Sequence, residues 1–183
     1  MELIEISPHS EDIILSLAYA SENNFTGRKI YSREACFLRK EAFTNFTKAV
    51  KIAENMGYKI KIFDAFRPTE AQKIMWNFNP DPRYIANPDS GSPHSRGVAV
   101  DLTLCSTNND ELDMGTDFDS FSPKSHHNYL DLPKKVLHNR SLLLGIMTLA
   151  GWDFFINEWW HYQLFKPKQY SLLTDKMAGT NMI

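Results

Sequence analysis

The stretch SPHSRGVAVDLTL, residues 92–104, decides the fold because it predicts a buried strand that carries one charge. From Gly97 onward apolar residues alternate along one face, as a strand pattern requires: Val98, Val100, Leu102 and Leu104. Asp101 falls on the other face. A buried carboxylate without a partner costs at least several kcal/mol. Asp101 therefore needs a cation or hydrogen-bond donors beside it.

Helices and strands follow one another on both sides of this strand. Apolar residues spaced three or four apart predict a helix that begins after Ser32, runs to Met56 and is closed by Gly57. Residues 58–63 alternate like a strand, and Pro68 opens a second helix.

The second half of the chain continues the mixture. A third helix is predicted from about Asn139 to Ala150, and a last strand over about residues 158–165, whereas residues 13–20 fit either a strand or a helix. Because no βαβ period recurs, we expect an α+β fold: one domain over residues 1–183, with a central antiparallel sheet flanked by helices.

Composition excludes several classes of protein. The 183 residues are 43% hydrophobic and 13% aromatic, which excludes disorder, and two cysteines exclude a disulfide scaffold. A net charge of -2 argues against a nucleic-acid partner, and no apolar run approaches the ~20 residues of a membrane span. The acidic N-terminal segment does not resemble a signal peptide, so we expect a cytoplasmic protein with reduced Cys36 and Cys105.

Two histidine-containing clusters suggest a metal site. His94 precedes the strand that carries Asp101, and Gly97 lets the backbone turn between them. The second cluster, EWWHY, contains His161 and, three residues earlier, Glu158. Two imidazoles and one carboxylate are the protein ligands of a catalytic zinc, and a spare carboxylate suits the general base. The alternative is that these groups are hydrogen-bonded core residues, because spacing alone does not bring the two clusters together.

A third segment, DAFRP, places Arg67 between a predicted strand and a predicted helix. Its guanidinium is either an ordinary surface group or a donor to a developing oxyanion.

Together these three segments resemble the D-alanyl-D-alanine dipeptidases of the VanX type, within the M15 zinc peptidases. The motifs NNFTG at residues 23–27, LDMGTDFD at 112–119 and SHH at 125–127 strengthen the resemblance to the dipeptidase branch. It implies the M15, hedgehog-like peptidase fold, with one zinc ion on the sheet.

The resemblance also implies roles for individual residues. His94, Asp101 and His161 correspond to the zinc ligands, Glu158 to the catalytic base, and Arg67 to the group that stabilises the tetrahedral intermediate. Three further residues fall where the family holds the ends of its substrate: Ser92, Tyr19 and Asp119.

The implied reaction is hydrolysis of D-Ala-D-Ala to two D-alanines, with the small dipeptide as the partner. Two alternatives stay open: a D,D-carboxypeptidase acting on longer peptidoglycan peptides, and a non-catalytic binding module stabilised by zinc. The oligomeric state is open too, with a homodimer among the alternatives.

The other histidines are predicted to have ordinary roles. His126 and His127 either pack a polar loop, which is the favoured interpretation, or steer the substrate or orient a metal ligand without binding the metal themselves. His9 and His138 are predicted to be exposed.

Overall fold

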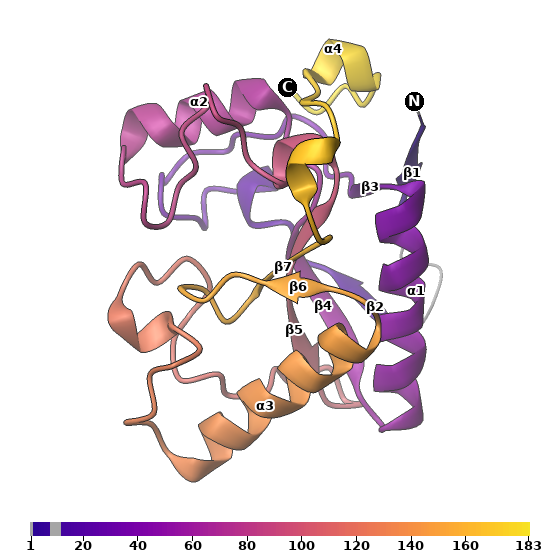
Figure 1. Cartoon of the computed structure of the whole chain (residues 1–183), viewed down its shortest axis with the longest axis vertical. Coiled ribbons are helices and arrows are strands. Elements are labelled where there is room, and N and C mark those ends of the chain that lie inside the picture. The colour runs from indigo at the N-terminus through magenta and orange to yellow at the C-terminus, as the bar shows by residue number, and fades with distance from the viewer. Residues whose placement is uncertain (1, 8–11) are drawn as a thin grey trace.

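The computed structural model describes residues 2–7 and 12–183, and His9 lies outside these ranges. A five-stranded sheet with the order β2-β4-β5-β7-β6 runs through the middle of the chain (Figure 1). Its strands are β2 (Ile13–Leu15), β4 (Lys59–Asp64), β5 (Ala99–Cys105), β6 (Asp153–Phe154) and β7 (His161–Gln163). A separate antiparallel pair joins β1 (Leu3–Glu5) to β3 (Phe37–Arg39).

The α+β class is as predicted, but the sheet is not wholly antiparallel. The edge strand β2 runs parallel to β4, whereas the other neighbours are antiparallel. The segment that returns from β2 to β4 includes α1, and a connection that crosses over in this way brings the second strand back in the same direction.

The helices are α1 (Lys40–Asn55), α2 (Thr69–Phe78), α3 (Lys134–Leu149) and the short α4 (Asp175–Ala178). The prediction that the first helix starts after Ser32 is wrong, because residues 37–39 pair with β1 instead. The third helix begins before Asn139, whose buried side-chain amide donates to the carbonyl of Asp113 over 2.8 Å. The last strand is shorter than predicted, so that Glu158 lies in the turn before it.

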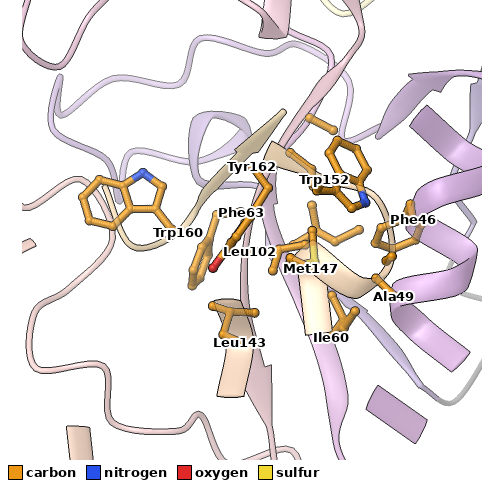
Figure 2. Close-up of a cluster of buried hydrophobic side chains, with 14 of the residues drawn as sticks. Phe46, Ala49, Ile60, Phe63, Leu102, Leu143, Met147, Trp152, Trp160 and Tyr162 are labelled. Carbon is orange, nitrogen blue, oxygen red and sulfur yellow. The ribbon is translucent and has the colours of Figure 1, made fainter. Parts of the chain in front are cut away.

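One large apolar cluster fills the space between the sheet and two helices. α1 and α3 contact each other, and their buried side chains meet those of β4 and β5 (Figure 2). The labelled members include Phe46, Ile60, Leu102, Leu143 and Met147. Burial of side chains of this size contributes roughly 1.5–3 kcal/mol each. This cluster fixes which face of β4 and β5 points inward.

The register of the central strands places the predicted metal ligands on the face opposite the apolar cluster. Asp101 lies directly across from His161, whereas their neighbours Val100 and Tyr162 pair on the core side. Directly opposed residues point to the same face of a sheet. The strand predicted from residues 97–104 is thus confirmed, and its one charged residue faces away from the apolar cluster.

A second, smaller apolar cluster lies around α2. It includes Tyr19, Tyr31, Phe66, Met75 and the C-terminal Met182, all nearly inaccessible to solvent. Segments far apart in the chain therefore meet here. None of the helices in the described parts of the chain has the length and apolar character that a bilayer span needs.

Both cysteines are buried free thiols, as predicted. Burial raises the pKa of Cys36 well above its ordinary value and that of Cys105 to about 11, where Glu111 adds to the effect. Since the thiolate is the reactive form, neither should react at pH 8 while the chain is folded. Ellman's reagent should detect two thiols only after denaturant is added. A native thiol that reacts within seconds would contradict this burial.

Candidate metal and active site

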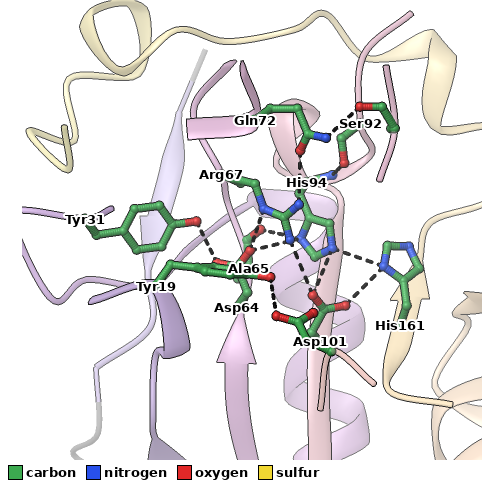
Figure 3. Close-up of polar contacts among 12 residues, drawn as sticks. Tyr19, Tyr31, Asp64, Ala65, Arg67, Gln72, Ser92, His94, Asp101 and His161 are labelled. Carbon is green, nitrogen blue, oxygen red and sulfur yellow. Dashed lines mark hydrogen bonds and ion pairs between the residues drawn. The ribbon is translucent and has the colours of Figure 1, made fainter. Parts of the chain in front are cut away.

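The predicted metal ligands lie together. The Nε2 atom of His94 is 3.0 Å from Nδ1 of His161, and the Asp101 carboxylate oxygens are 3.2 and 3.1 Å from these two atoms (Figure 3). All three residues are buried. The two clusters that sequence spacing could not join therefore meet at one point.

Each ligand comes from a different local structure. Asp101 and His161 are opposed across β5 and β7, and His94 begins a single 3-10 turn before β5. That turn ends at Gly97 in the left-handed conformation (φ 68), where an added Cβ would lie 2.8 Å from the Leu3 side chain. Only glycine therefore fits this bend without strain.

The hydrogen bonds of the imidazoles show that the group fits a cation. His94 donates through Nδ1 to the Ala65 carbonyl over 2.7 Å, and Nε2 of His161 lies 3.1 Å from the Gln163 side-chain oxygen, to which it donates. In neutral rings this leaves lone pairs on His94 Nε2 and His161 Nδ1.

Those two lone pairs and the Asp101 carboxylate face one another, and they repel unless a cation lies among them. Ligands at zinc-like bond lengths of about 2.0–2.1 Å lie roughly 3.3 Å apart, close to the observed spacings.

Asp101 stays a carboxylate in this setting. Burial alone would raise its pKa, but proton sharing with His94 and His161 outweighs burial and holds the pKa well below its ordinary value. The charge that the strand pattern left unexplained is therefore matched by a cation among these three residues, either a proton shared with the imidazoles or a metal ion, with Nη2 of Arg67 3.6 Å away.

Glu158 lies beside the ligand group with its side chain directed at the same cavity. Its Oε2 is 3.9 Å from Nδ1 of His161, and the residue is 6% exposed. Burial raises its pKa well above the ordinary value, and the nearby Asp101 and Asp119 raise it further. A carboxylate with a raised pKa accepts protons readily, which suits a general base.

Arg67 is a buried group, so the surface alternative is wrong. Its Nε donates to Asp64 over 2.8 Å, and its guanidinium carbon lies 5.1 Å from the centre of the Tyr19 ring. Burial would lower the pKa of Arg67, but Asp64 and the neighbouring tyrosines and Asp101 raise it, so the group stays charged. The remaining Nη2 faces the ligand group.

The residues predicted to hold the substrate lie at the edges of this group. Tyr19 donates from its hydroxyl to Asp119 over 2.8 Å, and burial raises the pKa of Asp119 to about 8. Asp119 also has a positive φ of 58, a strained backbone conformation for a residue with a side chain. The Ser92 hydroxyl accepts from the backbone N–H of His94 over 3.2 Å.

One cavity of about 560 Å³ joins these residues. Its lining includes all eight that the sequence singled out: Tyr19, Arg67, Ser92, His94, Asp101, Asp119, Glu158 and His161. Rings complete the wall: Phe25, Tyr84, Phe121, Phe155 and Trp160. Of these five rings, only Trp160 is adjacent to a predicted metal ligand in the sequence. Its neighbours Trp159 and Tyr162 do not line the cavity, and all three of these rings belong to the apolar cluster.

Sequence reasoning also missed the groups that hold the site residues. Asp64 and Gln163 each fix a functional side chain, Arg67 and His161 respectively. Asp64 carried a usable signal, since it is a carboxylate at the end of an apolar strand three residues before an arginine. Gln163 carried no such signal, because its contact with His161 depends on both side chains lying on the same face of β7.

Comparison with known proteins agrees with this geometry. A family model described as Peptidase_M15, D-ala-D-ala dipeptidase, matches residues 1–177. The chain belongs to the M15 peptidase family. The family and the peptidase activity predicted from the motifs are thereby confirmed. M15 peptidases depend on zinc, and the His94–Asp101–His161 group supplies a candidate site for a metal.

Individual relatives extend the likeness over most of the chain. The chain is 39% identical over 177 residues to an Escherichia coli protein, covering 97% of this chain and 92% of the relative. It is 33% identical to a Streptomyces coelicolor protein and 32% identical to one from Enterococcus faecium, covering 80% of this chain and 83% of each relative. All three relatives are named D-alanyl-D-alanine dipeptidase.

The two loop histidines take packing roles. His127 packs its ring against Phe154 and Tyr162, and the His126 ring lies 3.3 Å from the Tyr84 hydroxyl. Burial lowers the pKa of His127 to about 4, with Arg140 adding to the effect. His127 is therefore neutral at pH 7, while His138 is exposed, as predicted.

This depressed pKa predicts acid sensitivity. Below the ordinary pKa of 6.5 the unfolded chain binds a proton that folded His127 does not bind until about pH 4. The free energy of unfolding should therefore fall as pH falls through this window, by up to about 3 kcal/mol from this residue. Urea titrations at several pH values measure the free energy of unfolding. As pH falls, this free energy should decline less steeply for His127→Gln than for the wild type, whereas His138→Gln should match the wild type. Equal slopes for all three proteins would refute this role.

Proposed function

We propose that this protein is a zinc-dependent dipeptidase that hydrolyses D-Ala-D-Ala to two D-alanines. The observation that carries the proposal is the convergence of His94, Asp101 and His161 beside Glu158 and Arg67 in one cavity. The names of the similar proteins support the choice of substrate.

The three converging lone pairs would hold the zinc ion. Zinc in such a site polarises a carbonyl and lowers the pKa of a coordinated water to about 7. Glu158 accepts the proton of the attacking water and delivers it to the nitrogen of the leaving amine. Its burial and its position beside the ligand group suit both transfers.

Arg67 stabilises the charge that develops on the carbonyl oxygen. Its Nη2 points at the ligand group while Asp64 holds Nε, so the donor is already in place before the charge appears. Donors fixed in a buried site stabilise an oxyanion more than mobile donors in water.

Asp119 and Ser92 fit the two ends of a free dipeptide. A buried carboxylate with a pKa near 8 is costly to ionise alone, and a substrate ammonium would repay that cost. The Ser92 hydroxyl keeps its proton free to donate to the far carboxylate, since it accepts from His94 N–H. Recognition of an ammonium favours a dipeptide over the carboxypeptidase alternative, in which that end is an amide.

Substrate choice tests the proposed activity. Purified protein with one zinc per chain should release D-alanine from D-Ala-D-Ala, and much more slowly from a D-Ala-ended pentapeptide. It should cleave L-Ala-L-Ala to L-alanine much more slowly too. Zinc content is measured on the same sample. Faster cleavage of the pentapeptide would favour the carboxypeptidase, and no turnover in a zinc-replete sample would favour the binding module.

Replacement of Glu158 tests its role as the general base. Glu158→Gln should keep its zinc but lose turnover by roughly 10²–10⁴-fold, because the amide cannot accept the water's proton. Glu54→Gln, on the exposed side of α1, is the matched control and should retain wild-type rates. A fully active, zinc-loaded Glu158→Gln enzyme would exclude this mechanism.

We also propose a cytoplasmic location, which the unpaired buried thiols support, since disulfides are rare in reducing compartments. Cell fractionation tests the location, and light scattering tests whether the protein forms a homodimer.

A further inference from the structure

Gln72 is a buried polar residue whose position neither apolar packing nor contact with the cavity explains. It lies on the buried side of α2 with Ala71 and Met75, and it is only 1% exposed. A buried amide destabilises the fold unless both its oxygen and its nitrogen are hydrogen-bonded. Its retention there points to specific hydrogen bonds.

Both ends of the Gln72 amide are in use. Its Oε1 accepts from Nη1 of Arg67 over 3.0 Å, and its Nε2 donates to the Ala86 carbonyl over 2.7 Å (Figure 3). Only this orientation satisfies both neighbours, because a guanidinium can only donate and a carbonyl can only accept. Among neutral side chains an amide of this length meets both demands at once.

The contact with Arg67 completes the restraint of the guanidinium. Asp64 fixes Nε, Gln72 fixes Nη1, and Nη2 is thereby directed at Asp101 and the cavity. Asp64 alone would hold only one nitrogen of the planar group, which also lies over the Tyr19 ring. Two contacts on different nitrogens define the plane.

The contact with Ala86 reaches a different part of the site. Ala86 belongs to the segment between α2 and the His94 turn, which has no regular secondary structure through residues 79–93. This segment forms one wall of the cavity, with Tyr84, Ile85 and Asn87 among its lining residues. Gln72 therefore connects the cavity wall to the proposed oxyanion donor through one side chain.

We propose that Gln72 is a positioning residue that orients the Arg67 guanidinium toward the developing oxyanion and holds the cavity wall in register with it. The inference rests on the proposed function, since it gives Arg67 its role there. Gln72 does not line the cavity and acts through Arg67.

The test compares Gln72→Met with Gln72→Glu in the zinc-loaded enzyme. Methionine keeps the shape and loses both hydrogen bonds, whereas glutamate keeps an acceptor for Arg67 and loses the donor to Ala86. Lys73→Met, on the adjacent exposed position of α2, is the control. The measurements are kcat and KM on D-Ala-D-Ala, zinc content, and Ki of a phosphinate dipeptide analogue, whose tetrahedral anion resembles the intermediate.

Gln72→Met should lower kcat roughly 10–100-fold and raise the phosphinate Ki by at least a similar factor, because Arg67 is no longer held. Its KM should also rise, because the Ala86 tether is lost, while its zinc content should match that of the wild type. Gln72→Glu should recover part of kcat, because its carboxylate still holds Nη1. It should raise KM, since the Ala86 tether is lost. Lys73→Met should match the wild type.

The inference is overturned if folded, zinc-loaded Gln72→Met keeps wild-type kcat, or if kcat falls while the phosphinate Ki stays constant. If Gln72→Met does not fold, Gln72→Glu decides through KM, and a wild-type KM there refutes the tether. Failure of the proposed function is distinguishable, because the wild type itself would then neither cleave the dipeptide nor bind the phosphinate.

Discussion

The negative charge of Asp101 in the interior of β5 is the constraint on which the rest of the site depends. A strand this deeply buried offers no water to solvate a carboxylate, so the partners must come from other parts of the chain. His161 arrives by strand register, and His94 arrives through the bend at Gly97. Because these partners present lone pairs as well as rings, the arrangement favours the folded chain most when a cation is bound.

Because of this constraint, the two faces of the sheet have different roles. One face packs α1 and α3 and supplies rigidity, and the other face holds the charged groups between the sheet and the cluster around α2. Glu158 lies outside regular structure, yet its segment is held by hydrogen bonds to the loop that contains Ser125 and His127. Trp159 N–H donates to the Ser125 carbonyl over 3.1 Å, and His127 N–H donates to Ile156 over 2.9 Å.

The sequence allowed good prediction where local pattern and chemistry agreed. Alternation around Asp101 predicted both the strand and the face of its charge, and the spacing of His94, Glu158 and His161 predicted chemistry that the fold then brought together. Prediction failed where distant segments decide. Residues 37–39 fit a helical period as well as a strand, and only pairing with β1 settles their structure. Tyr31, which donates to Asp64 over 2.8 Å, and Gln72 gave no local signal because their partners lie elsewhere in the chain.

The irregular register of β4 has a consequence for how this chain can change over time. Ile62 pairs with Leu102 but Asp64 pairs with Asp101, so one extra residue is accommodated between them. This bulge turns Asp64 from the core side to the side of Asp101, where it meets Arg67. A turn such as 106–110, which precedes the bridge between Cys105 and Glu111, can gain or lose residues without altering which face a strand residue occupies. The segment from Ile62 to Arg67 has no such freedom. A single deletion there would move apolar side chains to the charged face of the sheet and charged side chains to the core face. Related chains should therefore vary little in length over this segment.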